Sequence, residues 1–117
     1  MDAIISIKPV YSRQILAGTK KYEFRKQVMK PVDRVYIYET RPTKRIVGYF
    51  TIKKILVDDP LKIWEMTYQA AGIEFRDYEQ YYLNFETAVA YQIDKFVKFK
   101  TPKILKRRPP QSFYYIN

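Results

Sequence analysis

The chain has 117 residues and carries 22 Lys and Arg against 12 Asp and Glu, so its formal charge is +10, and it contains neither Cys nor His. The missing cysteines exclude disulfides, thiol nucleophiles and cysteine-ligated metals, and the missing histidines remove the commonest general base and metal ligand. Any catalysis must therefore use Lys, Arg, Asp, Glu, Tyr, Ser or Thr side chains. Apolar residues make up 47% of the chain, which excludes the disordered class, and the length predicts one domain over residues 1–117.

The N-terminal part of the chain predicts a strand, a short helix and a second strand. Residues 3–8 (AIISIK) are compact and β-branched, which favours a strand that Pro9 ends. Residues 11–18 place apolar side chains at helical spacing and finish with Gly18, a residue typical of helix ends. Residues 21–26 alternate with period two, which predicts a strand.

The second of these strands has two different faces. Tyr22 and Phe24 share the apolar face. Lys21, Glu23 and Arg25 share the other, where residues two apart lie about 6.6 Å from each other. The charged face fits either a solvated surface with weak cross-strand ion pairs or a cluster that holds a ligand.

The middle of the chain predicts two longer strands and the start of a helix. Residues 34–40 and 45–57 are rich in β-branched and aromatic side chains. Gly48 in the second run predicts a bulge or a close approach of two backbones. Asp59 followed by Pro60 is typical of a helix N-terminus, with Asp as the cap and Pro at the first helical position.

A helical insert is expected over about residues 59–84. Apolar residues recur there at spacings of three and four, first in a helix that Gly72 ends and then in a shorter helix. The predicted apolar faces consist of Leu61, Trp64, Tyr68 and Ala71 in the first helix and of Phe75, Tyr78 and Tyr82 in the second.

Residues 87–99 predict a further long strand, and a basic tail follows Pro102. The tail contains the cluster Lys106–Arg107–Arg108, which fits either a phosphate-contacting arm or a solubilising turn. Five or six strands without strand–helix–strand alternation predict the α+β class. The expected architecture is a small β-barrel with a short N-terminal helix and the helical insert.

Charge is distributed unevenly along the chain. Residues 1–57 hold thirteen Lys and Arg against four Asp and Glu, residues 58–94 hold two against eight, and residues 95–117 hold seven against none. The two basic ends therefore predict a polyanion-binding face if they come together in the fold. The alternative is that the charge serves solubility alone.

The N-terminus carries Asp2 and no long apolar run, so we expect neither a secretory signal nor a membrane anchor, and we expect a cytoplasmic location. Asp58 and Asp59 are explained by helix capping, and no other carboxylates have the spacing of metal ligands. The glycines lie far apart, unlike those of a phosphate-binding loop. We therefore expect no metal and no cofactor.

Three ordered segments resemble the ASCH domain family, a branch of the PUA-like superfamily. ISIKPVYSRQILAGTKKYEFRK resembles the family's opening strand, helix and G-x-K-x-x-E-x-R signature, met here by Gly18, Lys20, Glu23 and Arg25. DRVYIYETRPTKRIVGYF is similar to its strand–T-x-P–strand–G segment, and RPPQSFYYI looks like the tail of one subgroup. The similarity spans nearly the whole chain and is weakest in the helical insert.

The resemblance implies a PUA-like barrel with a cleft between barrel and helices, and RNA-related or nucleotide-related work, often transcriptional coregulation. Some members are enzymes: one subgroup removes the acetyl group from N4-acetylcytidine, and at least one member is similar to a ribonuclease. The resemblance makes Lys20 and Glu23 the candidate catalytic pair. The amidohydrolase subgroup has Thr where this chain has Glu23, and it needs a downstream Glu, for which Glu65 and Glu74 are candidates.

The candidate ligand-binding residues come from the signature, the first strand, the turn after residue 39 and the tail. Tyr38, which adjoins that turn, is the expected base-stacking residue because aromatic planes beside cations suit single-stranded RNA. The full set is Ser6, Lys8, Lys20, Glu23, Arg25, Tyr38, Thr40, Arg41, Lys44, Gln111 and Ser112.

Three functions follow from these observations. The first is an RNA-binding protein that recognises single-stranded RNA or a nucleotide in a basic cleft and regulates transcription or translation. The second is an enzyme on RNA or modified nucleosides, either an N4-acetylcytidine-type amidohydrolase or a ribonuclease. The third is a protein-interaction adaptor that uses the acidic insert as its surface.

Overall fold

The computed structural model describes residues 1–117 and contains six strands, three α-helices and one short 3-10 helix. In chain order the elements are β1 (Asp2–Ile7), α1 (Pro9–Leu16), β2 (Tyr22–Arg25), β3 (Val35–Glu39), β4 (Arg45–Asp58), α2 (Pro60–Thr67), η1 (Tyr68–Ala70), α3 (Phe75–Tyr81), β5 (Ala88–Lys103) and β6 (Phe113–Ile116).

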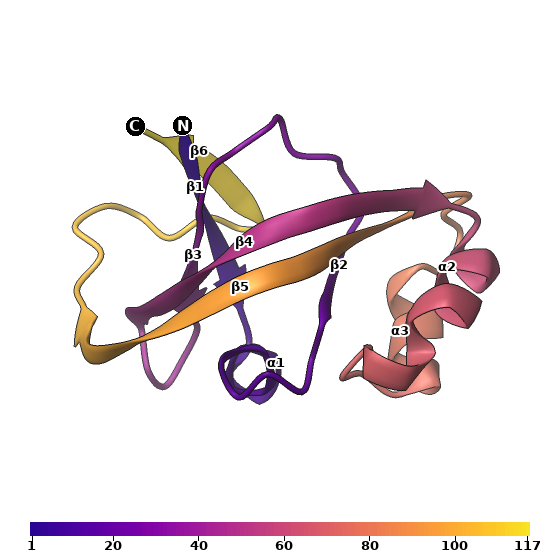
Figure 1. Cartoon of the computed structure of the whole chain (residues 1–117), viewed down its shortest axis with the longest axis horizontal. Helices are drawn as coiled ribbons and strands as arrows, with labels where there is room; N and C mark the ends of the chain where they lie inside the picture. Colours follow the sequence, from indigo (N-terminus) through magenta and orange to yellow (C-terminus); the bar gives the residue numbers. More distant parts are fainter.

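All six strands form one curled sheet in the order β2-β5-β4-β3-β1-β6, which confirms the α+β prediction. The sheet is a half-barrel: β2 and β6 remain its two edges. β1 and β3 pair in parallel, whereas every other pair is antiparallel. Figure 1 shows the long strands β4 and β5 crossing the molecule, with α2 and α3 at one end and β1, β3 and β6 at the other. The two chain termini lie side by side because Asp2 pairs with Ile116.

Two apolar clusters hold these parts together. The larger lies on one face of the sheet, where alternate residues of β1, β3 and β4 meet Ile15 of α1. The smaller joins the helices α2 and α3 to β2 and β5 through Phe24, Ile63, Tyr78 and Tyr82. None of the helices has the length and apolar character that a membrane crossing requires.

The start of the helical insert is as predicted, and its buried face is as predicted in part: Ala71, Tyr78 and Tyr82 are buried, and Trp64 packs against the smaller cluster. Asp59 caps α2 by accepting the backbone N–H groups of Leu61 and Lys62. Leu61 and Tyr68, expected to be buried, are 59% and 54% exposed. Ile63 and Thr67 are buried in their place. The helix ends at Thr67, and its contacts with the smaller cluster through Ile63 and Trp64 decide which side is buried. The repeat of apolar residues alone does not.

The strand β5 runs to Lys103 and passes through Pro102, beyond the predicted end at residue 99. β4 pairs with β5 along most of its length, whereas β2 pairs only with residues 89–92. The remainder of β5 is therefore an edge, where a proline costs little because its missing N–H faces no partner strand.

Gly48 lies where β4 and β5 approach closely, as its position in the sequence predicts. The register of the two strands shifts between Ile46 and Gly48. A Cβ atom on Gly48 would lie 2.2 Å from the backbone oxygen of Val97 and 3.0 Å from a methyl group of Leu16. Since the Val97 oxygen belongs to the sheet backbone, the sheet itself must shift to admit a side chain.

We therefore predict that Gly48→Ala lowers the free energy of unfolding by about 1 to 3 kcal/mol, as expected for overpacking. Urea denaturation followed by circular dichroism measures the change. Val57→Ala, at a position on the same strand that is 51% exposed, is the control and should stay within about 0.5 kcal/mol of the parent. Equal effects of the two substitutions would contradict the steric explanation.

Candidate functional site

A cleft of about 660 Å³ opens between α1, the strand β2 and the helix α3. The loop before β2, the ends of β1 and β3, and the segment before β6 complete its walls. The predicted site residues that line it are Ser6, Lys8, Lys20, Glu23, Arg25, Thr40 and Gln111. The fold thus brings together residues that are up to 105 positions apart in the chain, between Ser6 and Gln111.

Four other predicted residues do not line the cleft. Ser112 lies behind the wall and accepts a hydrogen bond from Arg25 at 3.3 Å. Arg41 and Lys44 are exposed in the turn between β3 and β4. Tyr38, the expected stacking residue, is only 8% exposed. Its partner in register, Ser6, donates to the carbonyl of Pro110, so the C-terminal segment passes this part of the sheet.

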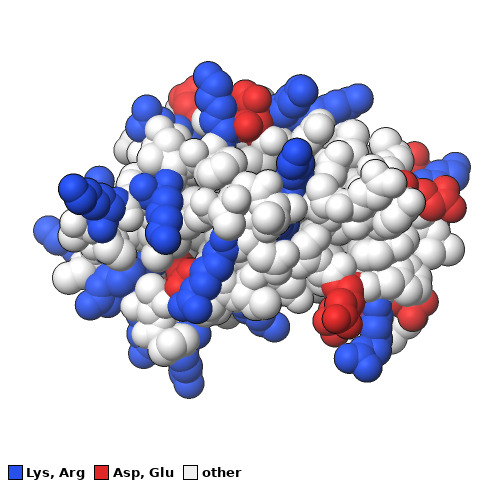
Figure 2. Space-filling model, turned by 60° about the horizontal axis from the view of Figure 1, so that its bottom comes forward, with Lys and Arg blue, Asp and Glu red and all other residues white.

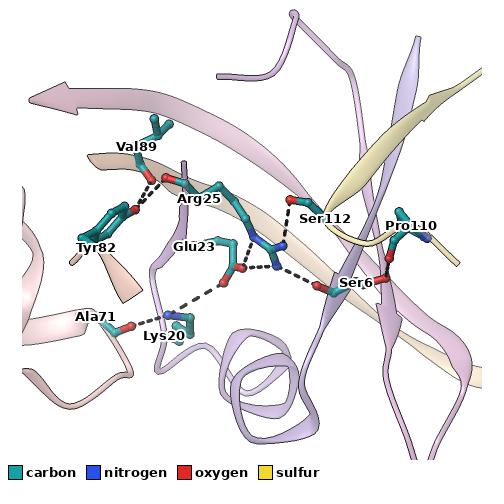
Figure 3. A network of polar contacts seen from close by, with 9 residues as sticks. All are labelled: Ser6, Lys20, Glu23, Arg25, Ala71, Tyr82, Val89, Pro110 and Ser112. Carbon is teal, nitrogen blue, oxygen red and sulfur yellow. Dashed lines mark hydrogen bonds and ion pairs between the residues drawn. The ribbon is translucent and has the colours of Figure 1, made fainter. Parts of the chain in front are cut away.

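The floor of the cleft is a buried chain of charged side chains (Figure 3). The Nε and one terminal nitrogen of Arg25 both donate to Oε2 of Glu23, at 2.9 and 2.7 Å. The Nζ of Lys20 lies 4.0 Å from the other oxygen, Oε1. Glu23 is 5% exposed, so water contributes little to the solvation of its charge. The two neighbouring cations stabilise the carboxylate instead.

Arg25 connects this carboxylate to the rest of the sheet. One terminal nitrogen also donates to the backbone oxygen of Ser6 at 2.8 Å, and the other donates to Ser112. The backbone oxygen of Arg25 accepts the Tyr82 hydroxyl at 2.7 Å. The guanidinium is therefore committed to the protein and positions Glu23. It is not a free fork for a ligand phosphate, which was one interpretation of the sequence.

Lys20 is the most unusual group of the cleft. The residue is 3% exposed, and its Nζ donates to the backbone oxygen of Ala71 at 2.5 Å. The same nitrogen lies over the rings of Phe24 and Tyr11, at 4.9 and 5.3 Å from their centroids. Burial lowers the pKa of Lys20 from 10.5 to about 8, while Glu23 opposes this shift and Arg25 adds to it.

Gly72 allows Lys20 to reach this position. A Cβ atom on Gly72 would lie 2.7 Å from Cγ of Lys20 and 2.8 Å from the amide oxygen of Gln14. The backbone angle φ of Gly72 is +68°, a conformation that other residues rarely adopt. The residue predicted to stop a helix therefore also leaves the space in which the lysine stem lies.

Several lining residues were not predicted from the sequence. Tyr11 comes from α1, and Asp77, Gln80 and Tyr81 come from α3. The hydroxyl of Tyr11 forms no hydrogen bond within the chain, and burial followed by the charge of Asp77 raises the pKa of Tyr11. The sequence did not indicate that Tyr11 lines a cleft, because a tyrosine at helical spacing usually packs in the core. It did not indicate Asp77, Gln80 and Tyr81 either, because these residues form a wall only once α3 packs near β2.

The cleft carries less positive charge than predicted. Its lining cations are Lys8, Lys20 and Arg25, and its lining carboxylates are Glu23 and Asp77. The lining therefore has a net charge of only +1. Glu65 and Glu74, the downstream carboxylates suggested by the family resemblance, are exposed and do not line it.

A second buried carboxylate, Glu39, was also missed. It accepts hydrogen bonds from the hydroxyls of Ser12 and Thr43, and Arg13 lies 3.5 Å from it. These contacts fix the start of α1 to the turn after β3. Glu39 therefore supports the wall that carries Thr40.

The low pKa of Lys20 predicts a pH dependence of stability. The unfolded chain binds this proton more tightly than the folded chain, so the contribution of Lys20 to stability rises with pH between about 8 and 10.5 and is constant below about 8. We compare the chain with Lys20→Met, which keeps the length of the side chain. The difference in unfolding free energy, parent minus variant, should increase by about 2 to 3 kcal/mol between pH 7 and pH 10.

Urea denaturation of both proteins at several pH values measures this difference, because the subtraction cancels the titration of other groups. Lys21→Met is the control, since Lys21 is exposed and should show no such increase. A constant difference for Lys20→Met across this range would contradict the lowered pKa.

Comparisons with known proteins agree with the fold and with the family resemblance. The model of the ASCH domain family matches residues 5–96. An ASCH domain-containing ribonuclease of Zymomonas mobilis is 30% identical over 92 residues, which cover 77% of this chain and 62% of that protein. The crystal structure of ASCH from Zymomonas mobilis superimposes with a TM-score of 0.92 at 27% identity, covering 99% of this chain and 87% of that one.

A different kind of relative is the ATP synthase subunit alpha of Ureaplasma parvum. It is 29% identical over 119 residues, which cover 97% of this chain but only 15% of that protein. The chain thus matches less than two thirds of the length of either curated relative. The family model, the ribonuclease relative and the superposition lead to one conclusion: the chain belongs to the ASCH domain family and has its PUA-like fold.

Proposed function

We propose that this protein binds single-stranded RNA and holds one nucleotide of it in the cleft, in a role that regulates transcription or translation. The observation that carries the proposal is the buried cluster of Lys20, Glu23 and Arg25 at the floor of a cleft. Groups with strongly shifted pKa values gather at functional sites, and Lys20 is such a group.

The size and lining of the cleft suit a nucleotide. A volume of about 660 Å³ lies within the range of small-molecule sites. Tyr11 and Tyr81 line the cleft and offer aromatic faces to a base, and Gln80 and Gln111 offer amide donors and acceptors to its edge. Single-stranded RNA is recognised by this combination of stacking and edge hydrogen bonds. A base within a duplex is already stacked and paired, so the proposal requires a single strand.

Two lysines of the cleft, Lys8 and Lys20, are placed to contact the phosphate of the bound nucleotide. Lys8 is exposed at the rim, whereas Lys20 lies at the floor and reaches a ligand only within the cleft. With a net lining charge of +1, the cleft contributes few of the phosphate contacts that make binding salt-dependent. Recognition in the cleft should therefore rest on the base and the sugar. The related protein described as a ribonuclease supports RNA as the ligand.

Fluorescence anisotropy with a labelled single-stranded RNA tests the proposal. Lys20→Met and Gln111→Ala should each weaken binding about tenfold, as expected when a buried polar contact of 1 to 2 kcal/mol is lost. The control, Lys53→Gln, removes one exposed charge from β4 outside the cleft and should have a smaller effect. Equal affinity for single-stranded and duplex RNA, or unchanged affinity of both cleft variants, would overturn the proposal.

A second candidate function, cleavage of RNA, is favoured by the state of Lys20. An amine with a pKa of about 8 is neutral in an appreciable fraction of molecules near neutral pH, so it can accept a proton. In the proposed step the neutral Nζ takes the proton of a ribose 2′-hydroxyl, and the 2′-oxygen attacks the adjacent phosphorus. The bond from phosphorus to the 5′-oxygen breaks, and that oxygen takes a proton from water. The products are a 2′,3′-cyclic phosphate and a 5′-hydroxyl.

The cleavage reaction makes a separate prediction. The rate should rise with pH through about 8 as Lys20 loses its proton, and Lys20→Met should abolish it while Lys21→Met leaves it unchanged. Gel electrophoresis of an RNA oligonucleotide measures the rate, and a 2′-deoxy substitution at the cleaved position should block the reaction. Binding that needs Lys20 without any cleavage would leave the first function and refute the second.

A further inference from the structure

We propose that the sheet carries a second contact surface for single-stranded RNA, separate from the cleft. The surface consists of Tyr36, Tyr49, Phe99 and Tyr114 together with Arg34, Lys103 and Arg107, and we call it the aromatic row. It extends RNA binding beyond the one nucleotide held in the cleft. None of its residues lines the cleft.

The strand register places these aromatic residues on one face. Tyr36 on β3 pairs with Tyr49 on β4 and with Ile4 on β1, and Ile4 pairs with Tyr114 on β6. Paired residues point to the same side of a sheet. The neighbours of Ile4 along β1 belong to the larger apolar cluster, so the row lies on the opposite face of the sheet from that cluster.

Three of the four rings form a continuous group on the sheet, and Ile4 on β1 separates them from Tyr114. Tyr36 and Tyr49 have ring centroids 5.6 Å apart, and Phe99 on β5 lies 6.3 and 6.1 Å from them. Tyr36, Tyr49, Phe99 and Tyr114 are all partly exposed. Cross-strand aromatic pairs stabilise any sheet, and this stabilisation is one role of the rings. It does not account for the cations that lie on them.

Each end and the centre of the row carry a cation over a ring. Arg34 lies over Tyr49 at 4.6 Å, Lys103 over Phe99 at 4.7 Å and Arg107 over Tyr114 at 4.1 Å from the ring centroids. These three cations are exposed. None of them has a carboxylate within ion-pair distance, because the ion pairs of the chain involve only the N-terminus, Arg13, Lys20 and Arg25.

The C-terminal basic cluster is fixed to this surface. The hydroxyl of Tyr114 donates to the backbone oxygen of Arg108 at 2.8 Å, so the tail bends back over β6. Together with the Arg107 guanidinium over the Tyr114 ring, that contact places Arg107 and Arg108 beside the row. Figure 2 shows acidic side chains at the right-hand end of the molecule and a further acidic group at the upper left, among many Lys and Arg side chains. Asp2 lies beside the row, where its carboxylate accepts the backbone N–H of Arg34 at 3.0 Å.

A partner that matches this surface must be planar and anionic along its length. Unpaired cations attract phosphates, while aromatic rings and guanidinium planes accept stacked bases. Single-stranded RNA has both properties. A row that crosses five strands spans about 19 Å at the usual strand spacing, which is room for two or three bases. In this arrangement the cleft, which has few charges, recognises the base, and the aromatic row supplies the phosphate contacts.

Binding of two ligands by anisotropy or competition tests the proposal. The first is a mononucleotide, which occupies the cleft alone, and the second is a single-stranded RNA of twelve nucleotides. Tyr36→Leu combined with Tyr49→Leu should weaken binding of the long RNA at least tenfold and leave mononucleotide binding unchanged. Lys20→Met should weaken both. Arg34→Gln and Arg107→Gln should each reduce the long-RNA affinity and the salt dependence more than Lys53→Gln, which removes an equal charge from β4.

Ultraviolet crosslinking of the unmodified protein to the long RNA, mapped by mass spectrometry, gives an answer even if the leucine variant fails to fold. Crosslinks at Tyr36, Tyr49 or Phe99 are expected. Crosslinks confined to Tyr11 and Tyr81 would overturn the aromatic row and leave the cleft proposal standing. Crosslinks confined to the row would support the row and overturn the cleft. Equal losses of long-RNA affinity for Arg34→Gln and Lys53→Gln, without crosslinks in the row, would overturn the proposal, because the binding would then be nonspecific attraction to positive charge.

Discussion

The carboxylate of Glu23 is the group on which the arrangement of the cleft depends. It is buried between two cations: Arg25 donates two hydrogen bonds to it, and Lys20 lies on its other side. Removing one partner of a buried ion pair leaves an uncompensated charge, which typically costs about 3 to 5 kcal/mol. Since Arg25 also holds β1 and the segment before β6, this carboxylate joins both ends of the chain to β2.

Because Arg25 is bound to Glu23, nucleotide recognition and phosphate contact fall to two different surfaces, whereas the sequence predicted one basic cleft for both. The positive charge of the chain suggested one basic cleft, yet the cleft commits Arg25 to Glu23 and includes Asp77 in its wall. The unpaired cations lie on the outer face of the sheet and on the tail. A site with few net charges and fixed polar groups is suited to recognise one nucleotide, whereas a surface of rings and free cations is suited to hold a strand.

Local signals in the sequence predicted the elements well, and they failed where distant packing decides. Asp59 caps α2 and Gly48 marks the close approach of β4 and β5, because capping and steric contact depend on few neighbouring residues. The prediction of the buried face of α2 was wrong at Leu61, which is exposed, and it missed Ile63, which is buried. A helix of two turns is held by one small cluster, so its repeat of apolar residues does not determine the side that packs.

The α+β class, the signature of Lys20, Glu23 and Arg25 and the family resemblance follow from the amino-acid sequence alone. Strand periodicity and a short spaced motif are local signals, because each depends only on residues that are close together in the sequence. Three features depend on packing between distant segments: the buried contact of Lys20 with Ala71, the second cleft wall formed by α3, and the burial of Tyr38. The burial that lowers the pKa of Lys20 comes in part from Ala71, 51 positions away in the chain, and no local pattern encodes that contact.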